Sequence, residues 1–177
     1  MLNKNQIFLI IILLSCIGSR ILTSIYYIED IDSLRFALSI YEYDLIKLQP
    51  HFPGYPVFSF IVKCLYLITG NMGVSFSIIG GISVFSIIYF LLRISKLIPL
   101  SKLGLFLIFI IFFNPLVWLM SNRYMPDLFG LSIFISALYL FISDIKDRRF
   151  LYLGYFLTGI LAGVRLSYLP LLAIPFL

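Results

Sequence analysis

Residues 28–56, IEDIDSLRFALSIYEYDLIKLQPHFPGYP, decide the fold because they hold most of the polar chemistry of an otherwise apolar chain. Five of the eight acidic residues lie in this stretch, together with the single histidine, His51. The stretch ends in the turn Pro-Gly-Tyr-Pro, in which two prolines restrict the backbone and a glycine permits a sharp bend. We therefore expect the function of the protein to depend on this segment.

The composition of the chain is that of an integral membrane protein. Hydrophobic residues make up 62% of the 177 residues and charged residues 12%, whereas a soluble domain is about half apolar and about a quarter charged. The net charge of +5 does not indicate nucleic-acid binding, because the basic residues lie at the ends of hydrophobic runs. We expect an all-α, polytopic helical membrane protein with no nucleic-acid partner.

Hydrophobic runs divide the chain into five predicted membrane spans and the beginning of a sixth. They cover residues 7–27, 72–92, 103–120, 128–143 and 150–166, and the sixth begins at 169–177. The length expected of a spanning helix is about 20 residues. A cleaved signal peptide is the alternative for the first run, but its apolar stretch continues past Arg20 and further spans follow. We predict one transmembrane module over residues 1–177, and we expect it to be the front part of a longer chain.

Residues 57–69 determine the predicted topology, because they are apolar enough to resemble a further span. They include Lys63 and are too few to cross a bilayer. A helix of this length covers about 20 Å of a hydrocarbon core about 30 Å thick, and a central lysine would cost about 3 kcal/mol. We therefore predict a helix lying in the membrane interface, within one external segment that extends from residue 28 to residue 71.

The basic residues agree with this topology through the positive-inside rule. Seven of them would face the cytoplasm: Lys4, Arg93, Lys96, Lys102, Lys146, Arg148 and Arg149. Four would face outward, namely Arg35, Lys47, Lys63 and Arg123, and Arg20 and Arg165 lie in helices. If residues 57–69 spanned, both short basic loops would lie outside. We predict a protein of the inner or plasma membrane with a cytoplasmic N-terminus and an active site on the external face.

Two aspartates are candidates for catalysis. Asp32 precedes an amphipathic helical pattern and shares a helical face with Arg35, three residues later. Asp32 can be the N-cap of that helix, or a general base whose position near an apolar surface suits it to take a proton from a hydroxyl group. Asp127 follows Pro126 at the start of the fourth span and permits the same two interpretations. The predicted topology places both on one side of the membrane.

Three motifs in this order resemble the start of a GT-C type membrane glycosyltransferase. They are DIDSLRFA at residues 30–37, QPHFPGYP at 49–56 and NRYMPDL at 122–128, and they follow an N-terminal span. The chain is similar to the bacterial branch related to lipid A aminoarabinose transferases and protein O-mannosyltransferases. The resemblance implies inverting transfer of a sugar from a polyprenyl-phosphate donor to an acceptor at the periplasmic or luminal face. It also implies two interfacial helices in the first external loop and an aspartate of that loop as base.

The resemblance assigns roles to individual residues. Asp32 matches the loop aspartate, with Asp30 as the alternative, and Asp127 matches the second acidic position. His51 would lie near the donor phosphate or a divalent metal, or it is an ordinary interfacial histidine with a local hydrogen bond. Because charge develops on the leaving phosphate, a cation must meet it. The candidates for substrate binding are Arg35, Lys63, Arg123 and Arg165, together with His51 and with Tyr55 of the turn; for Arg165, snorkelling to the interface is the alternative.

Two other classes of function compete with glycosyl transfer. A transporter or lipid-handling protein would use the same charges to bind or pass a substrate, and a membrane scaffold would need neither aspartate. Transporters tend to carry charged residues at mid-membrane and internally repeated halves. Here the acidic residues gather on one predicted face and no repeat is apparent. The chain also lacks a glycine-rich phosphate loop, so a nucleotide-sugar donor is not indicated, whereas a lipid-linked donor suits a chain of membrane helices.

Overall fold

The computed structural model describes residues 3–142 and 148–173, and its regular structure in these ranges is helical. The helices are α1 Lys4–Leu22, α2 Ile31–Tyr41, α3 Pro56–Thr69, α4 Met72–Ile94, α5 Lys102–Phe113, α6 Pro115–Asn122, α7 Asp127–Ile142, α8 Arg148–Val164 and α9 Leu169–Leu172, with a 3₁₀ turn at Leu166–Tyr168. Extended backbone pairs among these residues only at an isolated bridge between Asp44 and Gln49. The predicted all-α class is confirmed.

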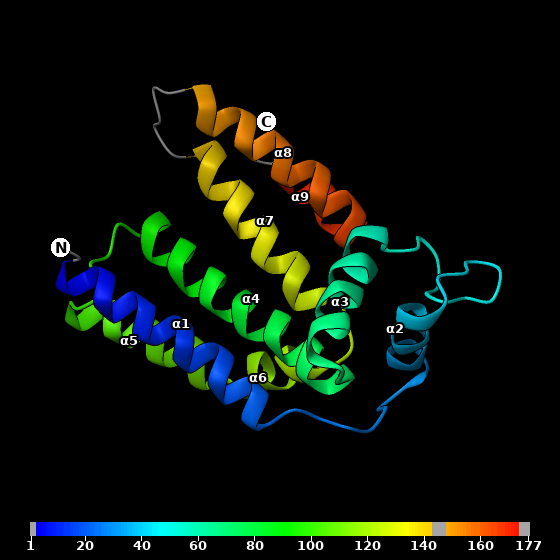
Figure 1. The fold of residues 1–177 in the computed structure, drawn as a ribbon. Helices are drawn as coiled ribbons and strands as arrows, with labels where there is room; N and C mark the ends of the chain where they lie inside the picture. Colours follow the sequence, from blue (N-terminus) through cyan, green and yellow to red (C-terminus); the bar gives the residue numbers. More distant parts are fainter. Residues whose placement is uncertain (1–2, 143–147, 174–177) are drawn as a thin grey trace.

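The longer helices run side by side, up and down, with α4 in the middle of the bundle (Figure 1). Close approach of α4 to its neighbours depends on glycine. A Cβ atom on Gly81 would lie 2.6 Å from Ile17 Cα of α1, and one on Gly80 would overlap the backbone of Ser121 in α6. Without a side chain at these two positions, three helices pack backbone to backbone.

Two of the described helices, α1 and α4, are long and apolar enough to cross a membrane, and a third span exists if α5 and α6 count as one. The sequence predicted a continuous third span at 103–120, but this run bends by 53°. The bend follows from Pro115, which lacks a backbone N–H, and from Asn114, whose side chain accepts hydrogen bonds from Leu116 N and Val117 N to cap a new helix.

The later helices are shorter than a bilayer is thick. Helix α7 has 16 residues, about 24 Å at 1.5 Å per residue, against a hydrocarbon core of about 30 Å. Helix α8 has 17 residues and begins at Arg148. Residues 143–147 and 174–177, which include the end of the predicted fourth span, Lys146 and the end of the predicted sixth run, lie outside the described residues. The arrangement of five complete spans remains a prediction.

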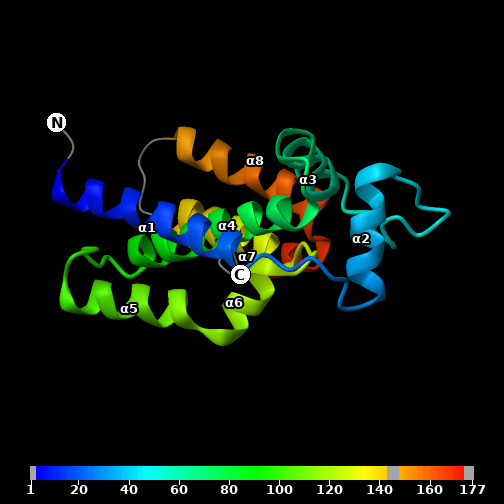
Figure 2. The same ribbon diagram turned by 60° about the horizontal axis from the view of Figure 1, so that its bottom comes forward.

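The segment 28–71 forms two helices at one end of the bundle (Figures 1 and 2). Helix α2 packs against α3, and α3 packs against α4 and α8. Phe58 and Val62 of α3 are buried, whereas Lys63 is exposed. Between α2 and α3 runs a loop that contains the Pro-Gly-Tyr-Pro turn. This end of the bundle therefore carries the polar segment that the sequence marked as decisive.

Candidate functional site

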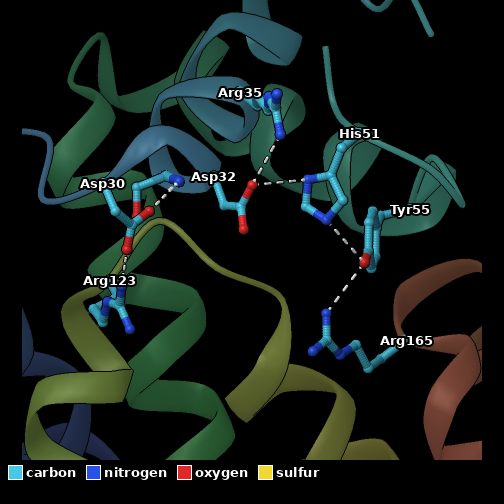
Figure 3. Close-up of polar contacts among 8 residues, drawn as sticks. Asp30, Asp32, Arg35, His51, Tyr55, Arg123 and Arg165 are labelled. Atoms are coloured by element: carbon cyan, nitrogen blue, oxygen red, sulfur yellow. Dashed lines mark hydrogen bonds and ion pairs between the residues drawn. The ribbon is translucent and has the colours of Figure 1, made fainter. Parts of the chain in front are cut away.

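Five of the candidate side chains meet at this end of the bundle, although they come from distant parts of the sequence. Asp32 lies in the first turn of α2, His51 and Tyr55 lie in the loop before α3, Asp127 begins α7, and Arg165 follows α8. They form one continuous series of polar contacts, of which Figure 3 shows the part from Asp32 to Arg165. Both aspartates therefore lie at one end of the bundle, and their placement on one side of a membrane stays a prediction.

The contacts run from one aspartate to the other. Asp32 Oδ1 lies 3.5 Å from His51 Nδ1, and His51 Nε2 lies 3.2 Å from the hydroxyl of Tyr55. Arg165 Nη1 donates a hydrogen bond of 3.2 Å to the same hydroxyl, while its Nη2 pairs with Asp127 Oδ1 at 2.8 Å. The contact between Asp32 and His51 lacks hydrogen-bond geometry, because His51 Nδ1 has no hydrogen-bond partner, and it is an ion pair only when the imidazole is protonated.

The donors and acceptors restrict the protons along this series. Arginine only donates, so the Tyr55 oxygen accepts from Arg165. In the contact between the Tyr55 hydroxyl and His51 Nε2, either atom can donate, depending on the imidazole tautomer. Tyr55 therefore lies between the Arg165 cation and the imidazole that faces Asp32.

Tyr55 links the two ends of the site, because its hydroxyl contacts both His51 and Arg165. It adopts a left-handed backbone conformation, with φ of 47°, which is uncommon for a residue other than glycine and costs of order 1–3 kcal/mol. Its ring is buried with an exposed fraction of 6%, and it lies edge-on against Phe36 at 5.0 Å. Burial raises the pKa of the Tyr55 hydroxyl and the nearby Arg165 acts in the opposite direction. The phenol therefore keeps its proton at physiological pH.

Asp30 and Asp32, which the sequence left as alternatives for the base, have different surroundings. Asp30 is the N-cap of α2, where its Oδ1 accepts a hydrogen bond of 2.7 Å from Ser33 N, and its Oδ2 pairs with Arg123. The hydrogen bond from the Ser33 backbone N–H is the main cause that lowers the pKa of Asp30. The capping role that the sequence considered for Asp32 therefore belongs to Asp30.

Asp32 remains available to a substrate. Its side chain is 40% exposed and its protein contacts are with Arg35, at 3.2 Å, and with His51. Neither contact uses Oδ2, so one carboxylate oxygen is free of ion pairs within the described residues. A carboxylate held from one side and open on the other is suited to accept a proton from an incoming hydroxyl.

Asp127 and Arg165 form the inner end of the site. Asp127 is the first residue of α7, and its carboxylate pairs with Arg165; Oδ2 is buried and has no hydrogen-bond partner among the described residues. The N-cap interpretation of Asp127 is therefore not supported by these contacts. Arg165 turns inward to Tyr55 and Asp127, so the snorkelling alternative is not what the contacts show.

Two predicted substrate-binding cations lie elsewhere. Arg123 pairs with Glu29 at 2.6 Å and with Asp30, so it ties the connection before α7 to the segment that precedes α2. Lys63 is exposed on α3 and makes no ion pair with a described carboxylate. Arg123 is thus occupied by two carboxylates, and Lys63 does not join the series from Asp32 to Asp127.

A divalent metal, which the resemblance left open beside His51, finds no ready set of ligands among the described residues. Among residues 3–142 and 148–173, no group of three His, Cys, Asp or Glu side chains is placed to hold an ion. Asp32 and His51 offer two ligand atoms, whereas Mg²⁺ takes about six. The described residues therefore do not fit a protein-held metal.

Sequence reasoning missed two residues of this region. Glu29 shares Arg123 with Asp30, and Tyr168 donates a hydrogen bond of 3.5 Å to the Asp127 backbone oxygen. Glu29 was one of the acidic residues in the decisive stretch, but nothing in its spacing distinguished it. Tyr168 carries no local signal, because its contact depends on how the turn after α8 packs on α7.

No family model matches the chain, and no curated protein or solved structure matches it. The functional argument therefore depends on the sequence and on the geometry of the site.

Proposed function

We propose that this chain is a module of a GT-C type membrane glycosyltransferase, which moves a sugar from a polyprenyl-phosphate donor to an acceptor hydroxyl at the external face, with Asp32 as general base. The observation that carries the proposal is the contact series from Asp32 through His51, Tyr55 and Arg165 to Asp127. It brings a half-exposed carboxylate and an inward-turned cation into one site, and an inverting transfer needs one of each.

The reaction assigns a separate task to each end of the site. The acceptor oxygen forms a bond to the anomeric carbon while Asp32 takes its proton, and the bond from that carbon to the phosphate oxygen breaks. The electron pair of the broken bond leaves with the polyprenyl phosphate, so the charges balance. The configuration at the anomeric carbon is inverted, because the acceptor attacks from the face opposite to the leaving phosphate. Because base and leaving group lie on opposite sides of the anomeric carbon, the cation that meets the phosphate must lie away from the base.

Arg165 meets this requirement better than Arg35. Arg35 touches Asp32 itself at 3.2 Å, whereas Arg165 is separated from Asp32 by both His51 and Tyr55. Tyr55 adds a neutral donor between the two ends. We assign Arg35 and His51 to holding the carboxylate of Asp32, and Arg165 and Tyr55 to binding the donor phosphate.

The location of the site also supports a lipid-linked donor. The polar end of the bundle lies beyond α1 and α4, the two helices with the length and hydropathy of membrane spans. Arg93, Lys96 and Lys102 lie at the other end, and by the positive-inside rule this distribution supports a site on the external face of the membrane. A donor carried on a polyprenyl chain reaches this end through the bilayer.

The test is transfer from a labelled polyprenyl-phosphate sugar by membranes that contain the full-length protein. Asp32→Asn should lower the rate by about 10²–10⁴-fold, the usual contribution of a general base, without changing the amount of inserted protein. Asp44→Asn is the matched control, because Asp44 lies in the same segment, 28–71, but pairs with Lys47. Unchanged transfer in Asp32→Asn membranes would reject Asp32 as the base.

One observation favours a transporter or lipid-handling protein as the second candidate. Arg20 of α1 is fully buried beside the break between α5 and α6; it donates to Phe112 O and Ser121 Oγ, both at 3.2 Å, and its guanidinium lies 4.0 Å from the Trp118 ring. Buried charges and broken helices are common in transporters. Translocation of a lipid or solute that survives Asp32→Asn but is lost in Arg20→Gln would favour this candidate.

A further inference from the structure

A large cavity of the described structure lies at the end of the bundle opposite to the candidate site. It has a volume of about 860 Å³ and lies between the start of α1, the end of α4, the turn that follows α4 and the end of α7. In Figure 1 this is the end marked by the N-terminus. The glycosyl-transfer proposal makes no use of it.

Among the described residues, positive charge lines this cavity without a matching negative charge. Arg93 and Lys96 belong to its wall, and no described aspartate or glutamate does. Arg93 donates from Nε and Nη2 to the hydroxyl of Tyr139, at 3.3 and 3.1 Å, and neither cation forms an ion pair with a carboxylate that the structure describes. The electrostatic character of the cavity therefore favours an anion.

Uncharged polar groups complete the wall of the cavity. Asn3, Asn5 and Gln6 line it from the first turn of α1. Asn3 and Gln6 already bond each other's backbone N–H groups in a capping box, but Asn5 Oδ1 is buried without a hydrogen-bond partner. A ligand with both an anionic group and a hydroxyl would satisfy the basic residues and this acceptor together.

An apolar groove continues from the cavity along the bundle. The groove has a volume of about 280 Å³ and shares three wall residues with the cavity, namely Gln6, Leu9 and Tyr89. Its remaining walls are Ile10 and Leu13 of α1 and Phe85 of α4, and both helices have the length and hydropathy of membrane spans. A basic chamber joined to an apolar groove on spanning helices has the shape that an amphiphile with an anionic head requires.

We infer that this end of the bundle binds an anionic phospholipid, with its phosphate between Arg93 and Lys96 and an acyl chain in the groove along α1 and α4. The bilayer supplies such a ligand directly, because the basic residues place this end on the cytoplasmic side, whose leaflet is rich in anionic lipids. The inference does not depend on the proposed glycosyl transfer, since the two sites lie at opposite ends of the bundle.

The experiment measures lipid retained by the full-length protein in nanodiscs of phosphatidylglycerol and phosphatidylcholine, by native mass spectrometry. Phosphatidylglycerol should be retained in preference to phosphatidylcholine. Arg93→Gln and Lys96→Gln should each lower its retention about fivefold, the change expected for about 1 kcal/mol per basic residue near a membrane surface. Lys102→Gln is the matched control, because Lys102 is a nearby lysine at the same end that does not line the cavity, and it should retain the wild-type amount.

A second variant separates the lipid from a soluble phosphate. Leu13→Trp fills the groove, so it should lower retention of phosphatidylglycerol while binding of glycerol phosphate stays unchanged. If inorganic phosphate or glycerol phosphate binds as tightly as the lipid, or if Lys102→Gln lowers retention as much as Lys96→Gln, the inference of a lipid site is overturned. Equal retention of phosphatidylcholine and phosphatidylglycerol overturns it as well.

Discussion

Tyr55 and Arg165 lie far apart in the chain, yet Arg165 Nη1 donates a hydrogen bond of 3.2 Å to the Tyr55 hydroxyl. The Arg165 guanidinium also lies 5.7 Å from the Tyr55 ring centroid. This contact joins the loop before α3 to the end of α8 and brings Asp127 into the same site as Asp32. The proposed function needs this connection, because it brings the proposed base, Asp32, and the proposed phosphate-binding cation, Arg165, into one site.

Removal of the Tyr55 hydroxyl should separate catalysis from packing. Tyr55→Phe keeps the aromatic contact with Phe36 but leaves His51 Nε2 and Arg165 Nη1 without their shared partner. We expect a loss of about 1–3 kcal/mol in stability and at least a tenfold loss of sugar transfer. Thermal unfolding in detergent and the transfer assay measure the two effects. Tyr41→Phe, which removes an exposed hydroxyl that contacts Tyr66, should change neither by much.

Arg165 and Asp127 should show strong energetic coupling. Arg165→Gln leaves the Asp127 carboxylate, which is only 20% exposed, without its cation. Asp127→Asn leaves the Arg165 guanidinium without its carboxylate partner. We expect each single variant to lose about 1–3 kcal/mol and the double variant to lose less than the sum. A double-mutant cycle on unfolding in detergent measures the coupling. If the two losses are additive, the contact between Arg165 and Asp127 contributes no interaction free energy to folding.

Acid should weaken the start of α2 through Asp30. Its folded-state pKa lies below the ordinary value of 3.8, chiefly because Ser33 N donates to the carboxylate. The stabilisation is therefore fully present above the unfolded pKa and is lost as the pH falls through the lower folded value. Asp30→Asn keeps a capping oxygen but does not titrate, so its stability should change less than that of the wild type below pH 3.8. Parallel acid titrations of both proteins would contradict this assignment.

The packing glycines of α4 should be intolerant of alanine. An added Cβ at Gly81 would lie 2.6 Å from Ile17 Cα, and this clash is relieved only if α1 or α4 shifts as a whole. We expect Gly81→Ala to destabilise the protein by about 1–3 kcal/mol. Gly159→Ala in α8 is the control, because nothing lies within 4 Å of its Cβ position, and its higher helix propensity should stabilise the helix by up to about 1 kcal/mol. Unfolding temperatures of the two variants compare them directly.

The sequence predicted the parts of the fold that depend on composition and periodicity. The all-α class followed from the apolar runs, and the charge count predicted that Asp32 and Asp127 share one side, which agrees with their place at one end of the bundle. The break at Asn114 was not predicted, because residues 103–120 have the length and apolar character of one span and only Asn114 and Pro115 end one helix and start another.

The contacts within the site were beyond the reach of sequence reasoning. Asp30 and Asp32 both precede the same helical pattern, and a shift of two residues in where α2 begins decides which of them is the cap. The direction of the Tyr55 side chain depends on its left-handed backbone and on the packing of Phe36. The partner of Arg165 depends on how α8 returns to α7, which no local pattern reports.

The most direct test of the central claim compares Asp32→Asn with Asp30→Asn in the full-length protein, with sugar transfer from a polyprenyl-phosphate donor as the measurement. If Asp32 is the base and Asp30 the helix cap, Asp32→Asn should transfer at less than about one hundredth of the wild-type rate, and Asp30→Asn should stay within about tenfold of it. Loss of transfer in Asp30→Asn together with full activity in Asp32→Asn would contradict the account.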